Sequence, residues 1–158
     1  MNDPKPEIIQ KLTETRRALM AFLQGLDEAQ WETAVYSEGE MWTAADVLRH
    51  LVNAESGMTG LIVQWKMGKD PVSPDFDLAR FNRSVIAKAK EKTPAELLAE
   101  METNRANLLQ VIDGLAGDDW QISGRHASLR ILTIEQTCHL IADHEAMHLQ
   151  DLQAALGG

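Results

Sequence analysis

The amino-acid sequence predicts an all-α protein, a four-helix bundle with one extra short helix. The chain is rich in Ala, Leu, Glu and Lys and has few runs of β-branched residues. Apolar residues recur at helical spacing in four long segments, which gives each segment one apolar face. Capping signals mark the starts of three of these segments. Four such helices most simply bury their apolar faces against one another, and we expect no β-sheet.

The first half of the chain contains two long helices and the short one. The first helix is expected over residues 5–26. A loop follows it, with a turn signal at 37–40, Ser-Glu-Gly-Glu. The second helix should begin at Thr43, where Thr-Ala-Ala-Asp resembles a capping box with Asp in place of Glu. Glycine and prolines at 68–74 end it, and a shorter helix is expected over about 77–90.

The second half contains the other two long helices. The stretch 93–96, Thr-Pro-Ala-Glu, has a Thr cap, Pro at the first helical position and Glu three residues after the cap. Residues 118–132 form a long loop or a short hairpin. The stretch 133–136, Thr-Ile-Glu-Gln, is another capping box. It begins a last helix that runs to about residue 156.

Length, charge and cysteine content limit the class of protein. The 158 residues fit one helical-bundle domain over residues 1–158. A net charge of −9 argues against partners such as nucleic acid or anionic membranes, which require a basic surface. The single cysteine, Cys138, cannot form an internal disulfide, which suits a reducing compartment. Without a visible signal peptide or an apolar run of roughly 20 residues, we expect a cytoplasmic protein.

Residues 144–148 read His-Glu-Ala-Met-His, the HExxH string of zinc proteases. Histidines four residues apart lie on one helix face, so His144 and His148 could bind one metal ion. In a protease, the intervening glutamate would be the general base. Such proteases take a third ligand from downstream, but only LQDLQAALGG follows His148. We therefore favour a metal site over a protease.

His50 is the best third ligand, because it lies on the apolar face of the second long helix and bundles build metal sites from facing helices. A lone histidine there is more often a core residue, but the downstream pair favours the ligand role. His139 lies about 140° around the helix from His144, so it is left out. His126, in a loop, is expected to be solvent-exposed or at a pocket mouth. Three imidazoles suit Zn, Ni or Fe(II) about equally well.

Other residues have both functional and structural interpretations. Glu145 could be a base beside the metal, but we favour a surface position. Asp46 could orient the ring of His50, but we favour its role in the helix cap. Cys138 is expected to be a small core residue. The tryptophans are expected to anchor the core and loops rather than form a substrate box; they are Trp31, Trp42, Trp65 and Trp120.

The order and spacing of several motifs resemble the DinB/YfiT-like superfamily of metal-dependent four-helix-bundle proteins. The motifs, which together span essentially the whole chain, are Trp42-Thr43, Asp46 to Leu51, Glu55, Phe81-Asn82, Thr93 to Leu98, Leu132 to Glu135 and His144 to His148. The resemblance implies a homodimer and metal ligands at His50, His144 and His148. Family members often have Gln three residues after the last histidine, where this chain has Asp151.

The resemblance also suggests an activity. Characterised relatives use such a site for thiol-dependent transfer or isomerisation, with mycothiol or bacillithiol as the low-molecular-weight thiol. The function expected from it is a metal-dependent enzyme of detoxification or stress response, acting on a small-molecule substrate. A different class stays open: a non-catalytic dimeric stress-response or binding module with a structural metal.

Overall fold

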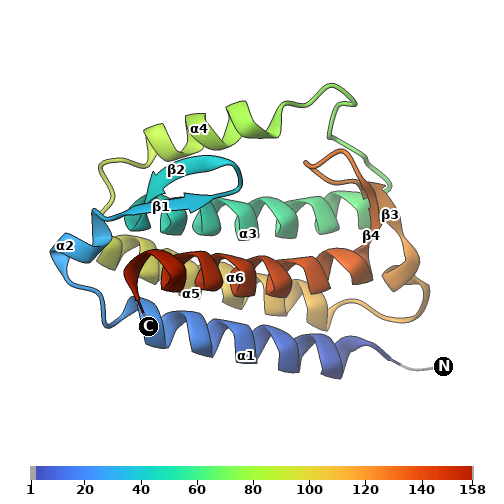
Figure 1. The fold of residues 1–158 in the computed structure, drawn as a ribbon. Coiled ribbons are helices and arrows are strands. Elements are labelled where there is room, and N and C mark those ends of the chain that lie inside the picture. The colour runs from blue at the N-terminus through green and yellow to red at the C-terminus, as the bar shows by residue number, and fades with distance from the viewer. Residues whose placement is uncertain (1–2, 158) are drawn as a thin grey trace.

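The computed structural model describes residues 3–157 and has four long helices that pack side by side (Figure 1). These helices are α1 (Lys5–Leu23), α3 (Ala44–Lys66), α5 (Pro94–Asp113) and α6 (Ile134–Leu156). Helix α6 packs against α1 and α3, and α5 packs against α3 and α1, which closes the bundle. The predicted four-helix bundle is confirmed, and α4 (Leu78–Lys88) is its extra short helix. Within residues 3–157, no helix is long and apolar enough to cross a membrane.

Side-chain caps begin the helices where the sequence predicts them. The side chains of Thr43, Thr93 and Thr133 accept hydrogen bonds from the backbone N–H three residues later, and all three capping boxes are closed. Each cap satisfies N–H groups that the first helical turn leaves without partners. The first helix ends at Leu23, earlier than predicted, because Gly25 and the capping box of Asp27 redirect the chain into a short helix, α2 (Glu28–Trp31).

Two short β-hairpins accompany the bundle. The first is not predicted by the sequence, whereas the second lies almost entirely in the segment 118–132, for which a long loop or a short hairpin is expected. Strands β1 (Ala34–Ser37) and β2 (Glu40–Thr43) pair antiparallel, as do β3 (Ser123–Arg125) and β4 (Ile131–Thr133). The segment between α5 and β3 contains the 3-10 helix η1 (Gly117–Gln121). Glu38 and Gly39 form a two-residue turn with positive φ at both positions, 51° and 77°. This conformation matches the twist of a tight hairpin.

The apolar core is divided into two clusters by a layer of buried charge. One cluster surrounds Leu48 and Leu51, and the other surrounds Ile62 and Ile112. Between them, each long helix contributes one charged residue at a position of its inward-facing stripe. The four residues are Arg16, Glu55, Arg105 and Glu145. We call these residues the ionic layer.

The ionic layer is closely paired. Arg16 contacts Glu55 at 2.5 Å and Glu145 at 2.9 Å, while Arg105 contacts Glu55 at 2.7 Å and also pairs with Glu145. The arginines also donate to backbone carbonyls of Met101 and Leu12. Two positive and two negative charges cancel, and these contacts offset the cost of removing them from water.

Cys138 and the four tryptophans are buried, as predicted. Burial raises the pKa of the Cys138 thiol to about 12, with Glu135 adding to the effect. A buried thiol with this pKa remains protonated at neutral pH and is a poor nucleophile. Cys138 is therefore a packing residue in the bundle.

The β3–β4 hairpin packs on α3 through a glycine contact. A Cβ atom added at Gly124 would lie 2.0 Å from Nε1 of the buried Trp65. We expect Gly124→Ala to lower the free energy of unfolding by about 1–3 kcal/mol, because the indole has no free space into which to move. Thermal or urea unfolding would measure this change. Gly60→Ala is the matched control in α3, where a new Cβ meets nothing within 4 Å. It should leave stability equal or higher; equal losses in both variants would contradict the packing argument.

Candidate metal centre

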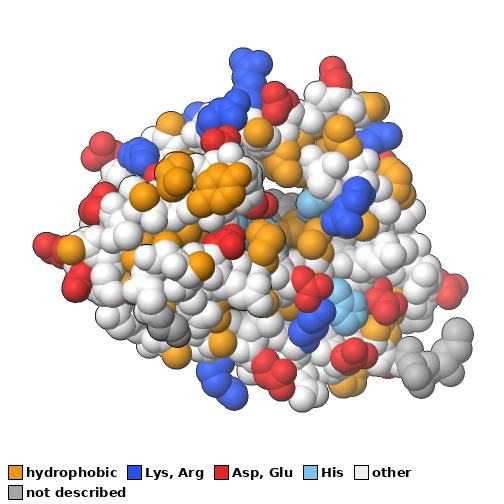
Figure 2. All heavy atoms as spheres, viewed as in Figure 1, with side chains coloured by type: hydrophobic (Ala, Val, Ile, Leu, Met, Phe, Trp, Pro, Cys, Tyr) orange, Lys and Arg blue, Asp and Glu red, His pale blue; other side chains and the backbone are white. Residues whose placement is uncertain are grey.

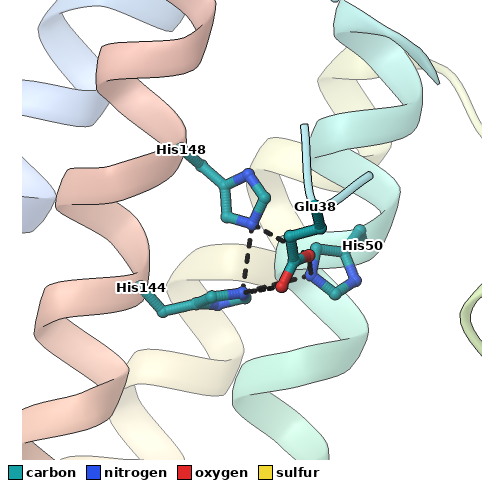
Figure 3. Close-up of side chains that lie close together, drawn as sticks. All are labelled: Glu38, His50, His144 and His148. Carbon is teal, nitrogen blue, oxygen red and sulfur yellow. Dashed lines mark hydrogen bonds and ion pairs between the residues drawn. The ribbon is translucent and has the colours of Figure 1, made fainter. Parts of the chain in front are cut away.

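The fold brings together the three histidines that the sequence singles out. His50 comes from α3, and His144 and His148 come from successive turns of α6 (Figure 3). Nε2 of His144 lies 3.2 Å from Nε2 of His50 and 3.0 Å from Nε2 of His148. The three rings therefore direct the same nitrogen toward one point between the helices.

Glu38, at the tip of the β1–β2 hairpin, completes the cluster and was not predicted. Its Oε2 lies 2.6 Å from Nε2 of His50 and 3.3 Å from that of His148, and its Oε1 lies 3.4 Å from Nε2 of His144. All four side chains offer ligand atoms within 4.8 Å of one another. An acidic residue in a Ser-Glu-Gly-Glu turn is usually solvated. The local sequence gives one signal of a special role for Glu38. The tight turn requires positive φ at this position as well as at Gly39, and glutamate seldom adopts positive φ.

A chain of hydrogen bonds fixes the orientation of His148. The hydroxyl of Ser37 lies 2.5 Å from Oδ2 of Asp151 and 2.9 Å from Nδ1 of His148. Because the carboxylate accepts the hydroxyl proton, the hydroxyl oxygen accepts the proton on Nδ1. Nε2 of the neutral ring then carries a lone pair directed into the cluster. Asp151, which stands where family members often have Gln, therefore orients the Ser37 hydroxyl that contacts His148.

The donor set fits a divalent transition metal. With its N–H on Nδ1, His148 directs the lone pair of Nε2 toward the other two Nε2 atoms and the Glu38 carboxylate. A cation between these four groups would be attracted to each of them. A tetrahedral zinc ion with Zn–N bonds of 2.0–2.1 Å separates its ligands by about 3.3 Å. The observed separations of 2.6–3.4 Å are close to this spacing.

Burial and charge set the protonation of this cluster. Burial lowers the pKa of His148, which is fully buried, and so favours the neutral ring that binds metals. Burial alone would raise the pKa of the Glu38 carboxyl. The contacts of this carboxylate with the imidazoles of His144, His148 and His50 outweigh the effect of burial and hold that pKa well below its usual range. Three imidazole nitrogens and one carboxylate form a ligand set typical of zinc, nickel or iron.

The cluster lies near the molecular surface. Figure 2 shows a hollow near the centre of this face, with histidine and acidic side chains at its edge and hydrophobic side chains around it. Trp42 packs on the ring of His50 with centroids 5.1 Å apart. The indole thus restrains the ring of His50.

The Ser37 hydroxyl should contribute to metal affinity. We expect Ser37→Ala to weaken zinc binding by about 10–100-fold, because it removes the acceptor that holds the His148 ring. Competition against a chromophoric chelator would measure the dissociation constant. Ser84→Ala, an exposed serine on α4, is the control and should bind as the wild type does. Unchanged affinity in Ser37→Ala would contradict the proposed orientation of His148.

The predicted surface position of Glu145 is wrong. The residue is 3% exposed, and its two carboxylate oxygens face Arg16 and Arg105 in the ionic layer. Adjacent residues on α6 point in different directions, so His144 faces the cluster while Glu145 faces the core. A carboxylate held by two guanidinium groups is not free to act as the base of a protease. The structure thus adds a second argument against that function.

The structure bears on two other interpretations of the sequence. The side chain of Asp46 accepts hydrogen bonds from the backbone N–H of Thr43, from Arg49 and from Lys90, so its predicted role in the helix cap is confirmed. His126 was expected to be solvent-exposed or at a pocket mouth; the first alternative is wrong, because the residue is buried, and the second stays a prediction. Nδ1 of His126 accepts from the backbone N–H of Ser128, which folds the loop over the ring. Burial lowers the pKa of His126, with Arg130 and His144 adding to the effect.

Residues 11–152 match the model of the DinB superfamily, and the chain belongs to this family. Several solved structures share this fold at low sequence identity. YfiT from Bacillus subtilis, a probable metal-dependent hydrolase with an unusual four-helix bundle topology, is similar with a TM-score of 0.77 and 20% identity. That match covers 97% of this chain and 87% of YfiT. None of the curated protein sequences matches the chain.

Two further structures are similar in fold. The mycothiol-dependent maleylpyruvate isomerase has a TM-score of 0.79 and 20% identity, with 98% of this chain and 62% of the isomerase covered. The chain therefore spans under two thirds of that enzyme. The colibactin self-resistance protein ClbS, in complex with double-stranded DNA, has a TM-score of 0.66 and 17% identity, with 97% of each chain covered. At these identities the likeness shows the fold alone.

Proposed function

We propose that the protein is a metal-dependent enzyme that uses a low-molecular-weight thiol to transfer or isomerise a small electrophilic substrate. The observation that carries the proposal is the convergence of the Nε2 atoms of His50, His144 and His148. The fold shared with a mycothiol-dependent isomerase supports the thiol chemistry. Zinc, nickel and iron(II) fit the ligands equally well.

The metal would supply one effect: a bound thiol has a lower pKa and is a better nucleophile at neutral pH. The three histidines would hold the ion, and Ser37 with Asp151 would keep His148 in the ligating tautomer. Cys138 is excluded as a nucleophile, because its thiol is buried and its pKa is about 12. The reacting thiol would therefore come from a cosubstrate.

Thiol consumption tests this function. The metal-loaded protein would be incubated with mycothiol, bacillithiol or glutathione and a panel of electrophiles, and the remaining thiol measured. Loss of thiol above the rate of His144→Ala, prepared in the same way, would support the proposal. If no thiol and electrophile pair reacts faster with wild type than with this variant, the thiol-dependent function is wrong.

A second function, a non-catalytic module with a structural metal, is favoured by one observation. Structural zinc sites are closed by four protein ligands, whereas catalytic sites keep an open position, and Glu38 lies where a fourth ligand would bind. Unfolding of the apo and metal-loaded protein, and of His50→Ala, separates the two. A large metal-dependent rise in stability without thiol chemistry would favour the structural role.

Assembly, partners and location are further parts of the proposal. We infer a homodimer in the cytoplasm that acts on small molecules rather than on nucleic acid. Exposed apolar side chains that could support a dimer interface are Tyr36, Met41, Met67 and Ile131. The net charge of −9 supports the exclusion of nucleic acid, although ClbS was crystallised with DNA. Light scattering and a DNA-binding titration at low salt would test the two points.

A further inference from the structure

Glu38 reaches the histidine cluster from outside the bundle. Figure 3 shows its carboxylate beside the three histidine rings, on a side chain that comes from the hairpin rather than from the helices. The Glu38 side chain is 28% exposed, whereas those of His50, His144 and His148 are 5%, 14% and 0% exposed. A small molecule that approaches the cluster from solvent therefore meets this carboxylate before it meets the histidines.

The backbone at Glu38 supports a functional reason for this residue. Its φ of 51° lies in the left-handed region, which glycine and asparagine adopt readily and glutamate seldom does. A tight hairpin would form more easily with Asn or Gly at this position. Strained conformations of this kind concentrate at ligand-binding positions. At the tip of an exposed turn, the side chain points inward to the histidines rather than out to water.

Two successive residues of the β1–β2 hairpin contact the histidine cluster. Ser37 contacts Nδ1 of His148, and Glu38 contacts Nε2 of the same ring and of His50. The β1–β2 hairpin is a two-stranded element of four residues per strand, and such hairpins are only marginally stable alone. Its tip can therefore open at lower cost than the helices that carry the histidines.

We propose that Glu38 is a displaceable fourth ligand of the metal, so that the β1–β2 turn closes the site until a small-molecule ligand takes the place of the carboxylate. This inference rests on the metal centre of the proposed function. A catalytic metal site needs an open coordination position, which four protein ligands would fill. If Glu38 can leave, this position opens by movement of the turn, and the helical bundle need not change. The closed turn also lowers the apparent affinity of any incoming ligand, because only the open fraction binds.

The test uses cobalt(II) in place of the native metal and 2-mercaptoethanol as the probe. Cobalt(II) affinity is measured by competition with a chelator, and probe binding by the near-ultraviolet charge-transfer band of cobalt thiolate. Glu38→Ala removes the carboxylate, and Glu38→Gly removes it while relieving the left-handed backbone. Glu40→Ala is the matched control: its carboxylate lies on the same hairpin and pairs with Arg83 at 2.9 Å, outside the cluster.

We expect both Glu38 variants to bind cobalt(II) at least about 10-fold more weakly than wild type. Loss of a direct ligand should weaken metal binding at least as much as loss of a residue that hydrogen-bonds to a ligand. Both variants should bind the probe at least about 10-fold more tightly, because no carboxylate competes. Glu40→Ala should match wild type in both measurements. Unchanged cobalt affinity in both Glu38 variants would overturn the ligand role. Weaker cobalt binding with unchanged probe affinity would overturn displacement. If wild type takes up no cobalt, the proposed metal centre fails as well.

Discussion

Glu145→Ala is expected to lower the free energy of unfolding by about 3–5 kcal/mol. The change would leave Arg16 and Arg105 facing only one carboxylate, that of Glu55, in the middle of the bundle. An uncompensated buried charge costs several kcal/mol, which is more than the pair itself contributes. The side chains of Arg16 and Arg105 are only 12% and 10% exposed, so contact with bulk water offsets little of this cost. Urea unfolding followed by circular dichroism at 222 nm would measure the loss.

The control for this prediction is Asp143→Ala, on the same helix. Asp143 pairs with Lys11 of α1 at 2.8 Å, but its side chain is 61% exposed. Exposed ion pairs contribute at most about 1 kcal/mol, so this variant should be near wild type in stability. If the two variants lose the same stability, the ionic layer is not the costly buried network that the contacts indicate.

His144→Ala is expected to weaken metal binding at least about 100-fold while the bundle stays folded. Loss of a residue that hydrogen-bonds to a metal ligand already lowers metal affinity about 10–100-fold, and this change removes the ligand itself. The affinity for zinc, measured by chelator competition, would show it. Because the His144 side chain is 14% exposed rather than fully buried, we expect its truncation to cost the bundle little stability.

His139→Ala is the matched control for the ligand prediction. His139 lies on α6 five residues before His144, and its Nδ1 faces Nζ of Lys11 on α1 at 3.4 Å. The change removes an imidazole from the same helix without touching the cluster. Zinc affinity should therefore equal that of wild type. An equal loss in both variants would indicate that helix integrity, not ligation, controls binding.

The helices and the three histidines could be predicted from the sequence because both follow from local rules. Capping boxes at Thr43, Thr93 and Thr133 mark helix starts within a few residues. The four-residue spacing of His144 and His148 places them on one face whatever surrounds the helix. His50 can be predicted because the pair needs a third ligand and this histidine lies on the apolar face of another helix of the bundle.

Glu38 and the ionic layer could not be predicted in the same way, because they depend on contacts between distant segments. An acidic turn gives no local reason to fold back over two helices. The sequence favours a surface position for Glu145, because glutamate is almost never buried without a partner and its partners lie 129 and 40 residues away. One pattern was present in the sequence: Arg16, Glu55 and Arg105 each interrupt an apolar helical stripe with a charge.

The metal content of the reconstituted protein tests the central claim most directly. Wild type and the triple variant of His50, His144 and His148 to alanine would be saturated with zinc, passed through a desalting column and analysed for metal. The cluster predicts one zinc ion per chain in wild type and essentially none in the triple variant. Wild-type protein that retains no stoichiometric metal, or a triple variant that retains as much as wild type, would contradict the account.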